Sequence, residues 1–142
     1  MIPPFDDNGN LPPGIHEGTW TQIAERFGTS EHRRGLLNGL RAALDSLKAA
    51  GCKRAYIDGS LITTKDIPND FDGCWEPDGV IPENLDPVLL DFSAGRAAQK
   101  VKFLGEFFIA DTSVLGIGRT FLEFFQNDKE TGDAKGIIGI DL

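Results

Sequence analysis

The segments Tyr56-Ile57-Asp58-Gly59-Ser60 and Asp70-Phe71-Asp72 decide the fold that this sequence predicts. An apolar strand ending in Gly-Ser lets backbone N–H groups approach a phosphate closely, because glycine has no side chain and tolerates unusual backbone angles. Aspartates at positions i and i+2 of a strand point to the same face. Asp70 and Asp72 can therefore bind one hard cation, while Phe71 faces the core. Together the segments predict a site for a nucleotide and a metal ion.

This pattern resembles the nucleotidyltransferase superfamily built on the catalytic core of DNA polymerase β, over a match from about Ala55 to Trp75. In that superfamily the Gly-Ser turn holds the triphosphate. The Asp-x-Asp pair and a third carboxylate bind two Mg²⁺ ions. The resemblance implies that Gly59 and Ser60 bind the nucleotide, and that the paired acids bind Mg²⁺ or Mn²⁺.

The motif does not identify the third carboxylate. Glu106 is the first candidate, because it lies centrally in the strand predicted for residues 101–110, where an unpaired acid would be costly to bury. Asp111 and Asp91 are the alternatives. If these acids do not bind metal, Glu106 would form a salt bridge and Asp111 would cap a helix. The predicted catalytic and metal-binding set is Asp70, Asp72 and Glu106.

Two further side chains near the motif have both a functional and a structural interpretation. Lys65 is the nearest cation that could meet a triphosphate, since phosphate sites favour positive charge, although an exposed lysine is usually only solvated. Trp75 is close enough to the acids to stack on a nucleobase, but a tryptophan is more often part of the core. We include Lys65 in the predicted nucleotide-binding set.

Composition limits the class of protein. The 142 residues fit one domain, and a net charge of -8 argues against nonspecific binding to nucleic acid, which needs a basic face. We expect no DNA partner, whereas a protein partner fits, and RNA stays open as an acceptor. No apolar run approaches the roughly 18 residues that span a bilayer, and the N-terminus has no signal-peptide pattern. We therefore expect a cytoplasmic protein that does not enter a membrane.

Patterning predicts an α+β fold with a small mixed sheet packed against helices. The four prolines and polar cluster near the N-terminus indicate an extended arm over residues 1–18, followed by a single domain over residues 19–142. A capping box predicts a helix at 20–27, and apolar spacing predicts another at 31–50. The remaining predicted helices are 85–100, in one or two pieces, and 118–127. The predicted strands are 53–58, 71–76, 101–110 and 136–142.

The function that these predictions favour is a metal-dependent nucleotidyltransferase, which moves a nucleoside monophosphate from an NTP to a hydroxyl on RNA, protein or a small molecule. The wider chain also looks like a family of small bacterial nucleotidyltransferase-like proteins of unassigned function, on the segments 11–16 and 95–100. The chain is short for an enzyme of this superfamily, whose members commonly carry an additional acceptor-binding domain. The alternative is a catalytically inert binding protein of the same fold, such as a component of a toxin–antitoxin pair. A third possibility is an interaction module whose acidic surface binds a basic chain.

Overall fold

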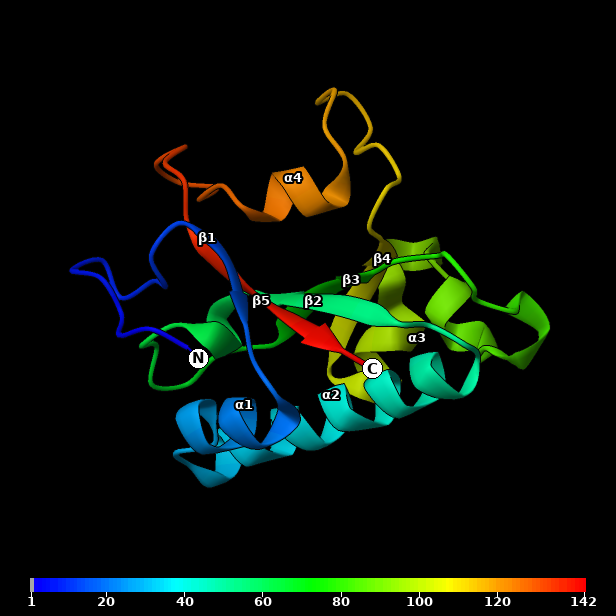
Figure 1. The fold of residues 1–142 in the computed structure, drawn as a ribbon, viewed down its shortest axis with the longest axis horizontal. Helices are drawn as coiled ribbons and strands as arrows, with labels where there is room; N and C mark the ends of the chain where they lie inside the picture. The colour runs from blue at the N-terminus through cyan, green and yellow to red at the C-terminus, as the bar shows by residue number, and fades with distance from the viewer. Residues whose placement is uncertain (1) are drawn as a thin grey trace.

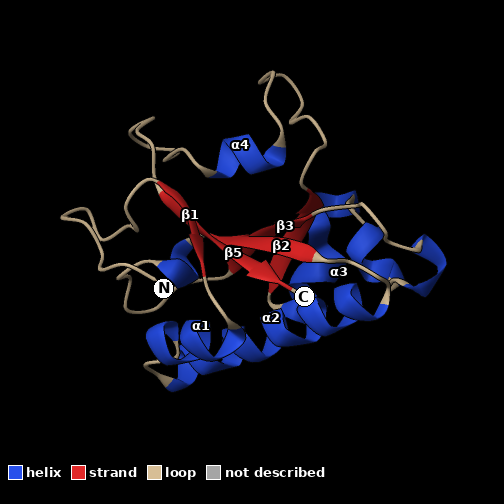
Figure 2. Cartoon of the chain, viewed as in Figure 1, coloured by secondary structure: helices blue, strands red, loops and turns tan. Residues whose placement is uncertain are grey.

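A mixed sheet of five strands lies between two unequal layers in the computed structural model, which describes residues 2–142. The helices α1 (Trp20–Phe27), α2 (Glu31–Ala49) and α3 (Ser93–Phe103) cover one face, and the short α4 (Phe121–Phe125) lies over the other (Figure 1). Figure 2 shows that loops make up most of the second layer. This is the α+β architecture that the sequence predicts.

The strands follow the order β1-β5-β2-β3-β4 across the sheet. β2 pairs antiparallel with β3 and with β5, whereas β1 pairs parallel with β5 and β4 parallel with β3. The strand bounds are β1 Gly14–Glu17, β2 Arg54–Asp58, β3 Phe71–Trp75, β4 Gly105–Ile109 and β5 Gly136–Asp141. Short 3₁₀ helices follow β2 and precede α3, at Ser60–Ile62, Pro82–Asn84 and Pro87–Leu90.

The predicted capping and apolar spacing account for α1 and α2. Thr19 and Gln22 form the capping box that starts α1, and the Ser30 hydroxyl accepts the Arg33 N–H at the start of α2. The two helices end within a residue of their predicted limits, which confirms both predictions. The apolar face of α2 is buried against the sheet and consists of Leu36, Leu37, Leu40, Ala43, Leu44 and Leu47.

Side-chain alternation gives the sheet one apolar face and one mixed face. Ile57, Phe71 and Phe107 are fully buried with the residues of α1, α2 and α3. The residues between them on the strands, Asp58 and Asp72 among them, point to the opposite face, which α4 covers. The apolar cluster of this second face is small and consists of Tyr56, Cys74, Ala110, Phe125 and Ile137. The acids of the motif therefore lie on the thinly covered face.

The predicted strand over residues 101–110 is wrong in its first half. Helix α3 continues to Phe103 and ends at Leu104, whose left-handed backbone (φ 66°) sends its N–H back to the Lys100 carbonyl. Only then does β4 begin, at Gly105. A Cβ on Gly105 would lie 2.6 Å from the Phe71 ring and carbonyl oxygen, so glycine permits the close approach of β4 to β3. Aromatic content indicated a strand here, but the turn at Leu104 decides where it starts.

The N-terminal segment, predicted as an extended arm over residues 1–18, forms a hydrogen-bonded turn at Asp6–Asn10, and Met1 lies outside the described residues. Its last part is β1, which the sequence did not predict. Ile15 of β1 lies opposite Ile137 of β5, and the preceding Leu11 is buried. The segment therefore contributes a strand to the sheet of the domain.

Within residues 2–142, no helix has the length and apolar character that would allow it to cross a membrane.

Candidate active site

The Gly59-Ser60 turn packs directly against the start of β3. Gly59 has φ 92°, and a Cβ there would lie 2.8 Å from the Asp72 nitrogen, so the position requires glycine. The Ser60 hydroxyl lies 3.3 Å from the Asp70 carbonyl oxygen and donates to it. The turn and the paired acids, ten or more residues apart in sequence, are therefore neighbours.

A buried arginine fixes the segment that follows the turn. The Arg33 guanidinium of α2 donates to the Leu61 carbonyl at 2.6 Å, to the Thr63 carbonyl at 2.8 Å and also to the Lys65 carbonyl. A longer bond of 3.4 Å reaches the Phe27 carbonyl at the end of α1. Removal from water lowers the pKa of this guanidinium. Arg33 thus ties the loop beyond Ser60 to the helical layer.

Strand register places three carboxylates in one row across the sheet. Asp58 of β2 lies opposite Asp72 of β3, and Asp72 lies opposite Glu106 of β4. Residues paired in this way point to the same face. Asp70 lies just before β3, outside this row, but near enough for its charge to raise the pKa of Asp72. The row crosses the face that α4 covers.

The clustered acids hold their protons more tightly than ordinary carboxyls. Burial, followed by the charges of Asp58, Asp70 and Glu106, raises the pKa of Asp72 to about 7. The pKa of Asp70 is raised by burial and then by Glu106. Burial also raises the pKa of Asp58, against the attraction of Lys135. The row is thus a region of unfavourable negative potential that a cation would relieve.

Basic side chains already neutralise two of these acids. Lys135 Nζ lies 2.6 Å from Asp58 Oδ1. Glu106 Oε2 binds Arg96 Nε at 3.0 Å and Lys100 Nζ at 3.5 Å. Across the described residues, no three His, Cys, Asp or Glu side chains are arranged to hold a metal ion together. The predicted ligand set Asp70, Asp72 and Glu106 is therefore not assembled here, because the Glu106 carboxylate is engaged by α3.

The two aspartates of the motif border different cavities. Asp72 lines a cavity of about 540 Å³, together with residues of the Gly59-Ser60 turn, α4, the N-terminal segment and the loop that precedes β5. Asp70 lines a neighbouring cavity of about 500 Å³ with His32, Lys100 and Leu104. Both volumes lie in the range of small-molecule sites. Residues of α2 and α3 line the cavity beside Asp70, whereas α4 and the loop before β5 line the cavity beside Asp72, so the predicted pair does not border one common cleft.

Positive charge enters the first cavity from a segment that the sequence analysis did not consider. Lys129 and Lys135 both line it. The Lys129 charge lowers the pKa of Asp72 against the effects that raise it, so the lysine lies close enough to act on that acid. No local pattern relates these lysines to the motif, because they lie more than 50 residues after it. A run of charged residues before the last predicted strand was the only signal.

The other predicted residues lie elsewhere. Lys65 is exposed and lines a separate cavity beside Phe5 and Arg33, although its charge lowers the pKa of Asp70. Asp91 accepts hydrogen bonds from Ser93 at the start of α3. Asp111 is exposed, beyond the end of β4. Register therefore favours Glu106 over both alternatives as the third acid.

Trp75 is unsuited to stack on a base. Its side chain is buried in the cluster between the sheet and helices α1 to α3, on the face away from the acids. The interpretation that Trp75 could stack on a nucleobase is therefore wrong, and the alternative, that it belongs to the core, is confirmed.

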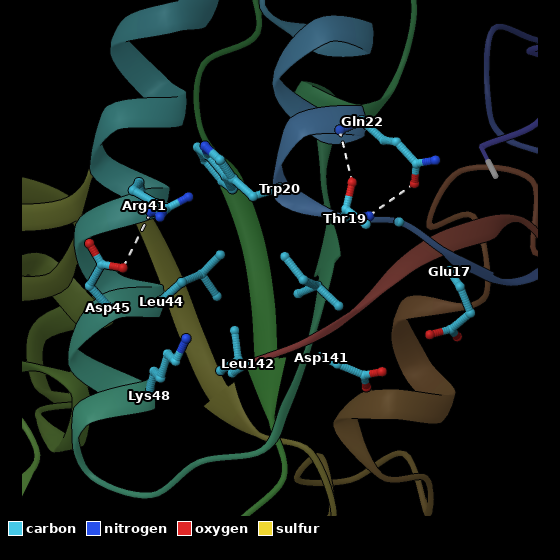
Figure 3. Close-up of a pocket in the computed structure, with 12 residues that line it drawn as sticks. Glu17, Thr19, Trp20, Gln22, Arg41, Leu44, Asp45, Lys48, Asp141 and Leu142 are labelled. Atoms are coloured by element: carbon cyan, nitrogen blue, oxygen red, sulfur yellow. Dashed lines mark hydrogen bonds and ion pairs between the residues drawn. The ribbon is translucent and has the colours of Figure 1, made fainter.

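A further cavity, of about 440 Å³, lies between α1, α2 and the end of β5 (Figure 3). Arg41 lies over the Trp20 ring there, 5.0 Å from its centroid, and pairs with Asp45 at 3.3 Å. This cavity contains none of the predicted site residues.

Comparison with known proteins gives one match, over residues 3–141, to the family of unknown function DUF6932. The chain belongs to this family. No curated protein and no solved structure matches the chain. The family description names no activity, so the resemblance to nucleotidyltransferases stays a prediction that rests on the residues themselves.

Proposed function

We propose that this protein binds an NTP with Mg²⁺ or Mn²⁺ and transfers the nucleoside monophosphate to a hydroxyl acceptor on RNA, protein or a small molecule. The observation that carries the proposal is the carboxylate row Asp58, Asp72 and Glu106, with Asp70 beside it, next to the Gly59-Ser60 turn. A cavity large enough for a nucleotide opens on the turn and on Asp72. The acids and the turn come from three separate segments of the chain, at β2, β3 and β4.

The donor set fits a hard divalent cation in its chemistry. Carboxylate oxygens are the ligands that Mg²⁺ takes in proteins, and the raised pKa values of Asp70 and Asp72 reflect burial first and then repulsion by neighbouring acids, which such a cation would offset. Asp70 and Asp72 are the ligands that we propose. Glu106 would join them only by exchanging its bonds to Arg96 and Lys100. When bound, the metal ion would neutralise charge on the transferring phosphoryl group.

The residues around the turn suit the triphosphate. Backbone N–H groups at a Gly-Ser turn can approach phosphate oxygens, and the Ser60 hydroxyl adds a donor. Lys129 and Lys135 supply the positive charge that Lys65 was predicted to supply. The cavity beside Asp70 gives the acceptor a separate route to the acids. NTP and Mg²⁺ are abundant in the cytoplasm, where we propose that the protein acts.

One observation favours the alternative, an inert binding protein of the same fold such as a component of a toxin–antitoxin pair. Glu106 is held by two cations, and the described residues contain no assembled metal site. An acidic protein with net charge -8 would suit a basic protein partner. In that case the carboxylate row would serve only to hold α3 and the loop before β5.

Transfer of label separates the two functions. The protein is incubated with each of the four α-³²P-labelled NTPs, Mg²⁺ and a cell extract, and labelled acceptors are separated by size. We expect one NTP to label an acceptor in the wild type and Asp70→Asn to reduce labelling at least roughly 100-fold, since the charge lost is one that acts in the transition state. Glu106→Gln tests whether Glu106 is the third metal-binding carboxylate. No labelling with any NTP, together with a basic protein recovered by pull-down, would favour the alternative.

A further inference from the structure

We infer that Phe124 is the platform on which the base of the bound NTP stacks. This inference rests on the proposed function, because it assigns the nucleoside half of the same ligand. The acids and the turn account for metal and phosphates, but they leave the base without a partner. The cavity beside Asp72 supplies one from α4.

Phe124 is the aromatic side chain available on that cavity. Two phenylalanines line it, and Phe125 is buried in the cluster against the sheet with 4% of its surface exposed. Phe124 is only partly buried, so its ring borders the open space. The other ring of this helix, Phe121, stacks on Phe108 with centroids 4.1 Å apart and does not line the cavity.

Lys129 links the ring to the acids. Its Nζ lies 5.9 Å from the Phe124 centroid, and its charge also acts on Asp58 and Asp72. The ring, the lysine and two acids of the row therefore line one cavity, as a single ligand with a base and phosphates would require. With a nucleotide bound, Lys129 would be drawn toward the phosphates, which frees the face of the ring for the base.

Amide groups surround the space next to the ring. Asn8 and Asn10 from the N-terminal segment and Asn127 from the loop after α4 line the cavity. Asn10 Nδ2 lies 3.3 Å from Asp128 Oδ2, which joins the N-terminal segment to that loop across the opening. Carboxamides both donate and accept hydrogen bonds, as the edge of a base requires. An apolar ring with amides at its rim is suited to a nucleobase.

Calorimetric titration with Mg²⁺·ATP and with Mg²⁺·tripolyphosphate tests the assignment, because the second probe has the phosphates and no base. Base stacking on an aromatic residue contributes about 1–3 kcal/mol, so the wild type should bind ATP roughly 5- to 150-fold more tightly than tripolyphosphate. Phe124→Leu should remove most of this ratio by weakening ATP alone. Phe124→Trp should retain it.

Phe121→Leu is the matched control, since it removes a ring from the same helix but not from the cavity. It should leave the ratio of the two affinities unchanged. A wild type that binds both ligands equally, or a ratio that survives Phe124→Leu, would overturn the base site while leaving the proposed function in place. A wild type that binds neither ligand would overturn both.

Discussion

Asp72 is the residue at which the chemistry of the site is concentrated. It lies between Asp58 and Glu106 in the row, borders the larger cavity, and has its pKa raised from 3.8 to about 7 by burial and by the three neighbouring acids. Carboxyls with perturbed pKa values cluster at functional sites. The row therefore costs stability at neutral pH.

The pH dependence of stability measures that cost. Because the folded state binds the Asp72 proton more tightly than the unfolded state, this residue favours folding fully below about pH 4 and loses that contribution as pH rises through about 7. We predict that Asp72→Asn raises the free energy of unfolding at pH 8 by about 1–3 kcal/mol, with a smaller gain at pH 5. Urea denaturation of both proteins at pH 5 and pH 8 measures the two changes.

Asp86→Asn is a control for which the expected change in stability has the opposite sign. The pKa of Asp86 is lowered, first by the hydrogen bond from Lys102, so this residue stabilises the fold above its ordinary pKa of 3.8 and loses that effect in acid. Asp86→Asn should therefore destabilise the protein slightly at pH 8. An Asp72→Asn variant that is less stable than the wild type at pH 8 would show that Asp72 is not strained by its neighbours.

At the scale of elements, the loop after the Gly59-Ser60 turn depends on α2. Arg33→Met keeps the apolar stem but leaves the carbonyls of Leu61, Thr63 and Lys65 without their donor. We predict a loss of roughly 2–4 kcal/mol in the free energy of unfolding, since one buried and two partly buried hydrogen bonds from a charged donor are lost. Nucleotide affinity should fall as well, because the turn loses its anchor.

The adjacent Arg34 provides the comparison. It is exposed and makes one bond, of 3.2 Å, to the Gly28 carbonyl. Arg34→Met should change the unfolding free energy by less than about 0.5 kcal/mol. Equal effects of the two substitutions in urea denaturation would refute the role given to Arg33.

Local pattern predicted the elements that are decided locally. The capping residue Thr19, the apolar spacing of α2 and the alternation around Phe71 depend on residues a few positions apart, and those elements form as expected. The turn at Gly59 was likewise predicted from residues that are close in sequence. The start of β4 was misplaced because the left-handed backbone of Leu104 is not a preference of leucine, and only packing in the fold imposes it.

Long-range pairing decided what the sequence could not show. Four-residue β1 forms only because β5, at the other end of the chain, offers an edge. Lys129 and Lys135 reach the acids in the same way, through the loop that leads into β5. Glu106 lies opposite Asp72 and forms the salt bridge that the sequence analysis gave as its structural alternative. Its partner Arg96 could not be named in advance, because Arg96 sits in an irregular left-handed turn of α3.

At the scale of the whole molecule, charge and layering act together. A net charge of -8 repels a free NTP, which is itself strongly negative, so binding must depend on cations at the site. The sheet supports the acids from one side with α1, α2 and α3. On the other side lies α4 with its loops (Figure 1), and residues of that layer line the cavity beside Asp72. The fold thus presents a rigid acidic row under a thin cover.

The most direct test of the account is the shift in melting temperature with Mg²⁺ and a nonhydrolysable NTP, each alone and both together. A ligand that binds the native state raises the melting temperature by mass action. We predict a shift of several degrees in the wild type only when both are present, and none in Asp70→Asn/Asp72→Asn relative to its own unliganded value. An equal shift in both proteins, or a wild-type shift that persists when EDTA replaces Mg²⁺, would contradict the metal-dependent nucleotide site.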